Sequence, residues 1–394
     1  MIQCHCFMNG YKSKDLFATL HSEICSGKYA SSGVFPSERA LVRRFHAARE
    51  TVRSALCELE KQHLIRRKVG CGTTVIAGKD HRRRFAVIVP DIFYPFYSRI
   101  VRGIETGLEQ KLGAGGYSLL VAALDREGSA SGRVMGAKDF AEVCVRENVA
   151  GVFFQPFQFL RSGEKINRAI LDVLSNARIP VILLDSDFLT PPRRSEYDLV
   201  GIDNVHAGYL LGRHVIECGA KRIWYFSNPL PAPTSLKRAD GVAMAVTEAG
   251  LRWRRDSVFF ADPADIRAAK RVFAGANRPD AIVAVNDHVA SILLRTLESI
   301  GKRVPNDVLL CGVNGDPVSM ELSPHLTTVV QPCARIGEGA VELLLQRLKD
   351  PSLPARELLL APHLEVREST LAGNGPRRSA RKKQVVCQGK GKGR

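Results

Sequence analysis

The chain has 394 residues, of which 45% are hydrophobic and 25% are charged, and its formal net charge at pH 7 is +17. The composition is typical of a soluble globular protein, and the length predicts two or three domains. No apolar run approaches the roughly 18 residues of a membrane span, and the opening MIQCHCFMNG lacks the pattern of a signal peptide, so we expect a cytoplasmic protein without a membrane partner.

Residues 1–12 are expected to be an N-terminal extension. Cys4, His5 and Cys6 could ligate a metal, but no second pair of ligands follows at a useful spacing. The 10 cysteines of the chain are scattered, which is typical of cytosolic thiols and not of a disulfide framework. We therefore expect no metal site and no cofactor.

The next segment has the pattern of three helices and a hairpin. Apolar residues at intervals of four predict a helix over 14–26. Pro36 fits the first turn of a second helix in FPSERALVRRFH, and after a tight turn a third helix is expected at about 48–61. LIRRKVGCGTTVI then predicts two short strands around a Gly-Cys-Gly tip. This order predicts a winged helix-turn-helix over residues 13–78.

The excess positive charge lies at the two ends of the chain. Residues 1–84 carry 16 basic and 7 acidic side chains, and residues 371–394 carry 8 basic and none acidic, which leaves 33 of each sign between them. A basic N-terminal module on a neutral body is typical of nucleic-acid binding, because phosphates attract Lys and Arg and release counterions. The tail 371–394 lacks apolar periodicity, so we expect it to be disordered, with added non-specific DNA affinity left as an alternative.

The N-terminal residues resemble a known DNA-binding family. GKY…FPSERAL…ARETVRSALCELEKQHLIRRKVGCGTTV is similar to the GntR-type winged helix across residues 13–76. The resemblance implies a recognition helix in the major groove of double-stranded operator DNA and a hairpin in the adjacent minor groove. By position it assigns DNA contacts to Arg39, Arg49, Glu50, Thr51, Arg53, Gly70 and Gly72.

The chemistry of these residues agrees with that assignment. Arginine makes bidentate contacts to guanine edges and donates to phosphates. Glu50 stays open between accepting from a cytosine amino group and pairing with a neighbouring arginine. Two residues depart from the family pattern: Ala48 replaces the usual Ser or Thr cap, a loss of roughly 0.5–2 kcal/mol, and Cys71 replaces a basic residue at the wing tip. We therefore expect the helix contacts to outweigh those of the wing.

After a basic linker at residues 79–84, short apolar runs alternate with amphipathic segments. The runs are FAVIVP, YSLLVAA, AGVFFQ, IPVILLD, LVGID, KRIWYF, DAIVAV and NDVLLCGV, and the amphipathic segments include 97–112, 204–218, 235–249 and 287–300. This alternation predicts an α/β fold of parallel sheets flanked by helices, arranged as two lobes over residues 85–370. Ligands of such folds bind beyond the carboxyl ends of the strands or between lobes.

Six segments of this body occur in an order that resembles LacI-type effector domains, relatives of periplasmic sugar-binding proteins. They are PDIFYPFYSRIVRGIE, VGIDNVHAGYLLGRHVIECGAKRI, SLKRADGVAMAVTEAG, DAIVAVNDHVASILLRTLESIG, SPHLTTVVQP and LEVREST. The resemblance implies a hinged, two-lobed sugar receptor that dimerises. By position it assigns effector contacts to Phe96, Tyr97, Gln155, Asp185, Thr234, Arg238, Asp287 and Asn314.

An Arg and Asp set satisfies sugar hydroxyls, and an aromatic face packs on the C–H side of a ring. Simpler alternatives stay open for two of these residues. Phe96 could be ordinary core, and Arg238 could form an ion pair with Asp185 or Asp287 without touching a ligand. Asn314, in GVNGDP, stands where the family usually has Asp, which removes a charge from that contact.

We therefore predict a dimeric transcription regulator, a repressor with activation left open as the alternative, whose operator affinity depends on a sugar effector. Each protomer is expected to read half of a palindrome. The chain lacks G-x-S-x-G and a P-loop, so we expect no enzyme activity. The alternatives are a plain sugar-binding protein and a glycosidase-like enzyme that uses Asp185, Asp203 and Asp287.

Overall fold

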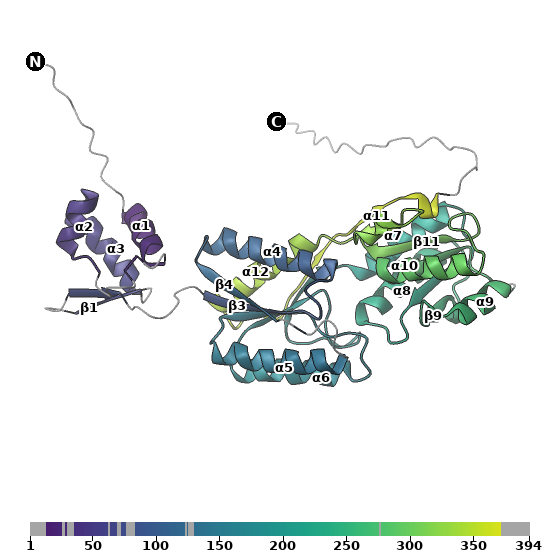
Figure 1. Ribbon diagram of the computed structural model, residues 1–394, viewed down its shortest axis with the longest axis horizontal. Coiled ribbons are helices and arrows are strands. Elements are labelled where there is room, and N and C mark those ends of the chain that lie inside the picture. The colour runs from purple at the N-terminus through teal and green to yellow at the C-terminus, as the bar shows by residue number, and fades with distance from the viewer. Residues whose placement is uncertain are drawn as a thin grey trace, which may run out of the picture. The chain divides into compact units, whose positions relative to one another are not determined.

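The computed structural model describes residues 13–25, 28–29, 35–61, 64–68, 72–75, 83–122, 124, 130–275 and 277–371 (Figure 1). The chain forms two compact units. The first comprises residues 1–203, 232–234 and 332–361, and the second comprises residues 204–231, 235–331 and 362–394. The first unit contains a small helical module and a six-stranded sheet, and the second contains another six-stranded sheet. No helix of the described part is long and apolar enough to cross a membrane.

The helical module has the predicted order of three helices and a hairpin. Its elements are α1 (Ser13–Cys25), α2 (Glu38–Phe45), α3 (Arg49–Lys61), β1 (Ile65–Lys68) and β2 (Gly72–Val75). The two strands are antiparallel, with Ile65 opposite Val75. Apolar residues spaced three and four apart turn one face of each helix inward, and Leu16, Leu41 and Leu56 are almost completely buried in a single core. The predicted winged helix-turn-helix is therefore confirmed.

A polar cluster ties α1 to the end of α2. The carboxylate of Glu23 accepts hydrogen bonds from Arg44, from Lys28 at 2.6 Å and from the hydroxyl of Tyr29 at 2.6 Å. The hydrogen bond from Arg44 is the main reason that the pKa of Glu23 falls to about 2. The guanidinium of Arg44 also lies 4.7 Å from the ring centre of Phe45, within the range of a cation–π contact.

The sheet of the first unit is entirely parallel. Its strands, in spatial order, are β13 (Glu357–Leu360), β7 (Asp198–Ile202), β6 (Val181–Leu184), β5 (Gly151–Phe154), β3 (Arg83–Ile88) and β4 (Tyr117–Val121). In Figure 1, α4 (Pro95–Leu112) and α12 (Cys333–Lys349) cover one face, and α5 (Ala130–Arg146) and α6 (Gly163–Asn176) cover the other. Because both faces are covered, the central strands are buried on both sides and read as continuous apolar runs. Strand β3 begins at Arg83, so the last two residues of the expected linker belong to this sheet, while residues 79–82 lie outside the described residues.

Two sets of contacts hold the C-terminal segment of the first unit, residues 332–361, against its N-terminal part. Helices α4 and α12 approach closely at Gly103, where a Cβ atom would lie 2.1 Å from the backbone oxygen of Ala334. The carboxylate of Asp198, whose side chain is completely buried, pairs with Arg347 at 3.0 Å and Arg356 at 3.3 Å. A buried carboxylate needs such partners, and these two arginines anchor the segment that leads into β13.

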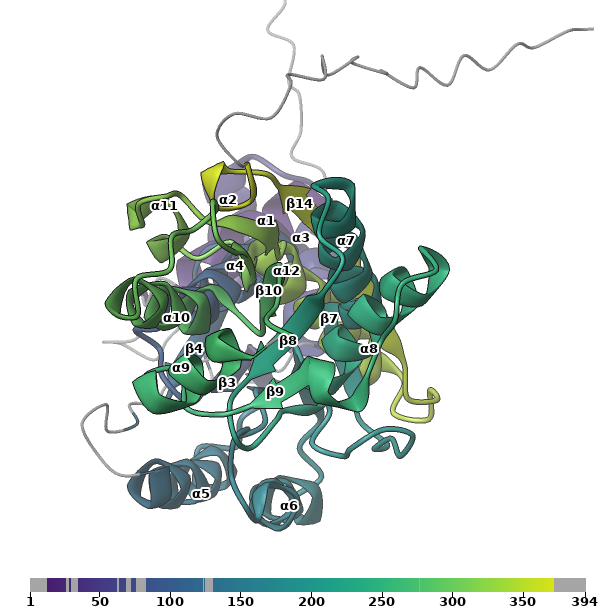
Figure 2. The same ribbon diagram turned by 90° about the vertical axis from the view of Figure 1, so that its right-hand side faces the viewer.

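The second unit has a sheet of the same size with one antiparallel edge. Its strands, in spatial order, are β14 (His363–Glu365), β12 (Thr327–Val330), β11 (Leu309–Asn314), β10 (Ala281–Ala284), β8 (Ile223–Ser227) and β9 (Val258–Phe260). Only β14 runs antiparallel to its neighbour. The helices are α7 (Asn204–Glu217), α8 (Pro233–Glu248), α9 (Ile266–Ala274), α10 (Asp287–Ser299) and α11 (Val318–Glu321), with short 3-10 turns at Arg255–Ser257 and Glu368–Thr370 (Figure 2). The predicted α/β class with parallel sheets and flanking helices is confirmed in both units.

Candidate functional sites

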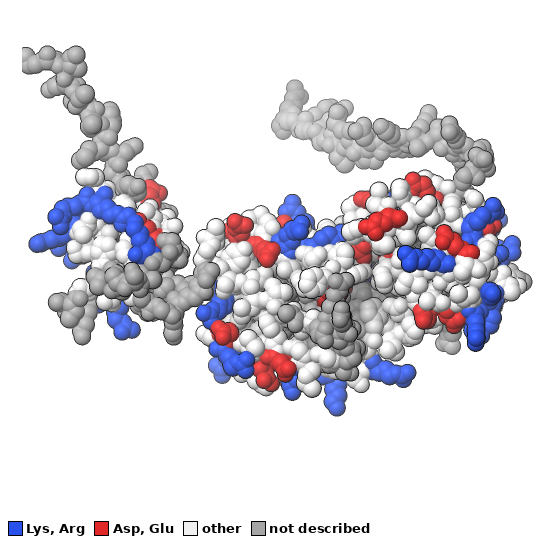
Figure 3. All heavy atoms as spheres, viewed as in Figure 1, with Lys and Arg blue, Asp and Glu red and all other residues white. Residues whose placement is uncertain are grey.

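The exposed edge of α3 carries the arginines that the sequence singled out. Val52 and Leu56 are buried, whereas the side chains of Arg49 and Arg53 keep 70% and 51% of their surface exposed. Arg39, on α2, is exposed as well. Figure 3 shows basic side chains gathered over this part of the helical module. An apolar back and a basic front on one helix fit a partner with a dense negative charge.

One acidic residue lies inside this basic face. The Oε1 atom of Glu38 accepts a hydrogen bond from the Nε atom of Arg49 at 2.6 Å, and this bond is the main cause of the lowered pKa of Glu38. Both residues border a surface recess of about 420 Å³ that is also lined by Arg39, Val42 and Arg43. The sequence reasoning missed Glu38, although it stands within the quoted motif FPSERAL.

The other predicted contacts of this module have different surroundings. Glu50 lies 3.6 Å from the Nη1 atom of Arg53, so the structure contains the arginine pairing that the sequence left open, but the Glu50 side chain is 84% exposed. Thr51 is half-buried on α3. Gly72 starts β2 with a φ of +84°, a conformation that glycine adopts without strain. Gly70 and Cys71 lie outside the described residues.

In the first unit, two of the predicted effector residues are neighbouring aromatics at the start of α4. Phe96 is only 5% exposed, which agrees with the simpler interpretation that it is part of the core. Tyr97 is half-buried, and its ring centre lies 5.3 Å from that of Phe96 and 5.6 Å from that of Tyr94. Tyr97 is therefore partly exposed, and its ring is close to those of both neighbouring aromatic residues.

Gln155 and Asp185 directly follow two adjacent strands of the first unit, β5 and β6. Gln155 is 1% exposed, and within the described part of the chain neither Oε1 nor Nε2 of its side chain has a hydrogen-bond partner. The Nε2 atom of Gln158, in the same loop, is in the same condition. A buried amide without a partner costs about 1–3 kcal/mol, so these groups point to a bound molecule that completes them.

Asp185 shows backbone strain at the same edge of the sheet. Its φ is +62°, which is uncommon for a residue with a side chain, and such strain often occurs at functional sites. Its backbone N–H donates to the oxygen of Val200 at 2.7 Å. The fold leaves room for this turn only because residue 201 is glycine: a Cβ atom there would lie 2.8 Å from the backbone oxygen of Asp185.

In the second unit, Arg238 is buried and donates to neutral acceptors. It is 5% exposed, and its Nε and Nη1 atoms donate to Asn204 Oδ1 at 2.8 Å and to the Val285 oxygen at 2.7 Å. Within the described residues Arg238 forms no ion pair with Asp287, which was one of the alternatives left open by the sequence, and the two oxygens of Asp287 accept hydrogen bonds from other groups. Thr234, in the first turn of α8, is also buried, but it belongs to the first unit.

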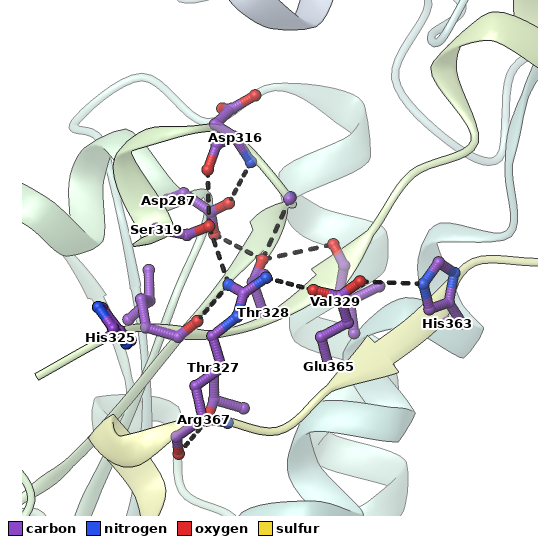
Figure 4. Close-up of polar contacts among 12 residues, drawn as sticks. Asp287, Asp316, Ser319, His325, Thr327, Thr328, Val329, His363, Glu365 and Arg367 are labelled. Atoms are coloured by element: carbon purple, nitrogen blue, oxygen red, sulfur yellow. Dashed lines mark hydrogen bonds and ion pairs between the residues drawn. The ribbon is translucent and has the colours of Figure 1, made fainter. Parts of the chain in front are cut away.

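Asp287, the first residue of α10, is hydrogen-bonded to the loop that follows β11 and to strand β12 (Figure 4). It is completely buried, and its Oδ1 and Oδ2 atoms accept from Thr328 Oγ1 at 2.6 Å and from the backbone N–H of Asp316 at 2.8 Å. Burial raises the pKa of Asp287 to about 7. With both oxygens engaged, this carboxylate fits a role in holding the strand ends better than direct contact with a ligand.

Asn314 forms a pair with a residue that the sequence reasoning missed. Its Oδ1 atom accepts from Gln331 Nε2 at 2.8 Å, and its Nδ2 atom donates to Asp316 Oδ2 at 3.1 Å. Gln331 is 2% exposed, and its Oε1 atom has no hydrogen-bond partner among the residues that the structure describes. Gln331 directly follows strand β12, just as Gln155 directly follows β5, so its position at the end of a strand is a signal that could have found it.

The motifs LTTV and VREST are joined by one hydrogen-bond network in the second unit (Figure 4). Arg367 donates to Ser319 Oγ at 2.9 Å and to the Leu326 oxygen at 2.7 Å, and it pairs with Glu365. Its backbone N–H donates to Thr327 Oγ1 at 2.8 Å. These contacts fix the edge strand β14 beside β12 and keep Asp316 and Thr328 in place around Asp287.

The described residues contain no group of three or more His, Cys, Asp or Glu side chains that could hold a metal ion. Cys4, His5 and Cys6 lie outside the described residues. Five cysteines of the described part, Cys57, Cys144, Cys218, Cys311 and Cys333, are free thiols.

Two family models match the chain in the regions just described. Residues 12–75 match the model described as "Bacterial regulatory proteins, gntR family". Residues 213–370 match the "Periplasmic binding protein-like domain". Both domain types expected from the sequence motifs are therefore confirmed.

The relatives with known roles are transcriptional repressors. The chain is 27% identical over 310 residues to the HTH-type transcriptional repressor PurR of Photobacterium profundum, covering 77% of this chain and 84% of that protein. It is 26% identical over 361 residues to the arabinose metabolism transcriptional repressor of Geobacillus stearothermophilus, covering 89% and 94%.

Solved structures show the same architecture. The regulator CcpA of Lactococcus lactis has a TM-score of 0.61 at 23% identity and covers 73% of this chain and 99% of its own. The complex of the regulator CelR with cellobiose has a TM-score of 0.61 at 24% identity and covers 90% of this chain and 98% of its own. At these identities the likeness demonstrates a shared fold.

Proposed function

We propose that this chain is a bacterial transcriptional repressor in which a GntR-type winged helix binds operator DNA and a periplasmic-binding-protein-like body binds a small sugar that controls this binding. The observation that carries the proposal is the presence, in one chain, of an arginine-edged α3 and of a buried, unpartnered amide at the strand ends of the body. The first fits a polyanionic partner, and the second fits a small polar ligand.

The DNA half of the proposal rests on the exposed side chains of α2 and α3. Arg49 and Arg53 are four residues apart on one helix face, and Arg39 lies on the preceding helix. Arginines so placed can contact guanine edges from within the major groove while neighbouring basic groups contact phosphates. Glu50 and Thr51 complete the set on α3, and Gly72, which has no side chain, allows the start of β2 to come close to the minor groove.

The effector half rests on polar groups at the carboxyl ends of the strands. Gln155 offers both a donor and an acceptor, and Arg238 keeps its Nη2 atom outside the hydrogen bonds to Asn204 and Val285. Paired hydroxyls of a sugar match such groups, and Tyr97 can pack against the apolar side of the ring. The named relatives support this class of ligand: one represses arabinose metabolism, and one solved regulator holds cellobiose.

Control requires that the sugar bind one conformation of the protein better than another. We infer that the protein acts in the cytoplasm as a homodimer in which each winged helix reads one half of a palindromic operator, because a two-fold protein matches a two-fold site. Light scattering of the purified chain, alone and with operator, tests the dimer. A monomer in both states would contradict it.

The link between the two halves is tested by Arg238→Met. Operator sequences are first selected from random double-stranded DNA with the full chain, and a panel of pentoses and hexoses is then screened for release of that DNA. The variant should bind the operator like the wild type and lose the response to the sugar. Arg295→Met, a change of the same size at an exposed position of the same unit, is the control and should keep the response.

A sugar response that survives Arg238→Met would remove this arginine from the effector site. Failure of the wild-type chain to prefer any DNA sequence would overturn the proposed function as a whole. A glycosidase-like enzyme is the second candidate, and it is disfavoured because both oxygens of Asp287 are already engaged. Turnover of model glycosides that is abolished by Asp185→Asn would reverse that order.

A further inference from the structure

Glu38 is the only acidic residue that borders the arginine-lined recess on the described DNA face. It is the first residue of α2, directly after the cap Ser37, whose Oγ atom accepts from the backbone N–H of Ala40 at 3.3 Å. The side chain of Glu38 is 24% exposed and that of Arg49 is 70% exposed. The carboxylate is therefore the better-held member of the pair, and the arginine is the one that extends toward solvent.

The surroundings of Glu38 are strongly basic. Arg49 donates to it directly, and Arg53 and Arg67 lie close enough to lower its pKa further by their charges. Arg39 and Arg43 line the same recess. A carboxylate in this place weakens the attraction of the face for any polyanion, because it cancels one positive charge that would otherwise displace a counterion. If Glu38 contributes to DNA binding, it must therefore do so by something other than its charge.

The geometry of the Glu38–Arg49 contact supplies that benefit. The hydrogen bond uses the Nε–H of Arg49, and no other hydrogen bond engages this guanidinium in the described part of the chain. The two Nη atoms and their four N–H groups stay available. A bidentate contact to the O6 and N7 atoms of guanine needs two parallel N–H groups in a fixed plane, which a tethered guanidinium presents better than a freely rotating one.

We propose that Glu38 is a positioning residue for sequence recognition: its carboxylate holds Arg49 by the Nε atom and aims both Nη atoms at a guanine in the operator. This inference rests on the proposed DNA-binding function. It assigns Glu38 a cost in non-specific affinity and a gain in discrimination between sequences. An acid in the first turn of a helix can also act merely through the helix dipole, in which case it would affect folding and leave DNA discrimination unchanged.

Glu38→Gln separates the two roles, because only the positioning of Arg49 predicts a change in the preference for selected over scrambled DNA. The variant, made in the full chain, is titrated by fluorescence anisotropy against double-stranded DNA selected by the wild type and against a scrambled sequence of equal length and composition. If Glu38 positions Arg49, affinity for the selected DNA falls about five-fold, within the range of a weakened base contact. Affinity for the scrambled DNA stays the same or rises, because a negative charge has gone.

Glu58→Gln is the matched control. Glu58 lies on α3, is 47% exposed and pairs with Lys61 at 3.7 Å, so the variant makes the same change of charge in the same module. It should leave the preference for selected over scrambled DNA as it is in the wild type. Far-ultraviolet circular dichroism with thermal unfolding checks that all variants are folded at the temperature of the titration.

A double-mutant cycle tests whether Glu38 acts through Arg49. In an Arg49→Ala background, Glu38→Gln should cause no further loss of affinity for the selected DNA, since the group that it positions is absent. Equal losses in both backgrounds, or a Glu38→Gln variant that behaves like Glu58→Gln, would overturn the proposal. If the wild type itself fails to distinguish selected from scrambled DNA, the proposed function falls, and the role of Glu38 falls with it.

Discussion

The winged helix and the carboxyl edge of the second unit's sheet hold their charged groups in opposite ways. On α3, Arg49 keeps 70% of its side chain exposed, and its contact with Glu38 is at the surface. At the edge of the second sheet, Asp287 is completely buried and is held by a hydroxyl, a backbone N–H and the fold around them. The first region leaves charge available to a partner, and the second uses a buried carboxyl group to fix its own strands.

This difference predicts whether a substitution in each region alters binding or stability. Exposed ion pairs contribute about 0–1 kcal/mol to folding, so changes on α3 should alter binding and leave stability nearly intact. Removing or displacing a member of a buried polar cluster leaves other groups unsatisfied, so changes near Asp287 should alter stability first.

The largest expected effect is at Gly312, in the buried strand β11. A Cβ atom there would lie 2.4 Å from the Oδ1 atom of Asp287 and 3.2 Å from its backbone. Gly312→Ala should therefore lower the free energy of unfolding of the second unit by about 3 kcal/mol, through overpacking and the loss of the Thr328 hydrogen bond. Urea unfolding followed by tryptophan fluorescence measures this unit alone, because both tryptophans of the chain, Trp224 and Trp253, lie in it.

Gly275→Ala is the control for that experiment. A Cβ atom at Gly275 would meet nothing closer than 3.6 Å, and its φ is −75°, so the substitution should leave the unfolding curve within about 0.5 kcal/mol of the wild type. Equal effects of the two substitutions would contradict the contrast between a buried, fixed cluster and an open surface.

The next largest effect is at Arg49. Arg49→Ala should weaken operator binding about thirty-fold, or about 2 kcal/mol, because a bidentate base contact is lost. The thermal midpoint of unfolding should hardly change, since the side chain is mostly exposed. A variant that unfolds early while keeping its operator affinity would show that Arg49 serves the fold and would reverse the comparison.

The two regions should also respond to pH in opposite directions. Burial raises the pKa of Asp287 from its ordinary 3.8 to about 7, so its contribution to stability is complete below about pH 4 and is lost as the pH rises through 7. The hydrogen bond from Arg44 lowers the pKa of Glu23 from 4.5 to about 2, so its contribution is complete above about pH 4.5 and is lost as the pH falls toward 2.

Tryptophan-monitored urea unfolding at pH 5 and pH 6.5 tests the first of these. The second unit should be more stable at pH 5 by on the order of 1–2 kcal/mol. Asp287→Asn should flatten this dependence, because the amide does not titrate. A second unit that gains stability as the pH rises would show that the carboxylate is charged in the folded state.

The smallest effect is expected at Gly72, in the wing. Its φ is +84°, and a Cβ atom there would meet nothing within 4 Å. Gly72→Ala should therefore cost only the backbone strain of about 1 kcal/mol, seen as a small decrease in the thermal midpoint of the winged helix. A loss like that of Gly312→Ala would indicate that the wing is packed as tightly as the buried strand.

The two regions also differ in how far their chemistry could be predicted. The GntR-type motif placed Arg39, Arg49 and Arg53 on an exposed face, and the structure agrees because side chains on a short helix follow its periodicity. The same motif contained Glu38, whose importance depends on the packing of α2 against α3. Periodicity within one helix does not show which residues of two helices meet.

In the α/β body, the LacI-type resemblance selected candidate effector residues but could not give their contacts. The resemblance selected Gln155, whose buried amide lacks partners among the described residues, and it did not select Gln331, which follows β12. It could not tell that Phe96 is buried, that Arg238 donates to neutral acceptors, or that both oxygens of Asp287 are already engaged. Each of these facts depends on a partner from another part of the chain.

The sequence by itself determined the division of charge, the helix faces and the alternation of strands and helices, because these follow from local composition and periodicity. The two domain types were implied by the resemblance of its motifs to known families. Only the tertiary structure decided which polar groups pair. The hydrogen bonds of Asp287 join it to residues 29 and 41 positions away, and the bond between Glu38 and Arg49 spans 11 positions and two helices. Such pairings arise when separate elements pack together, and local patterns do not record them.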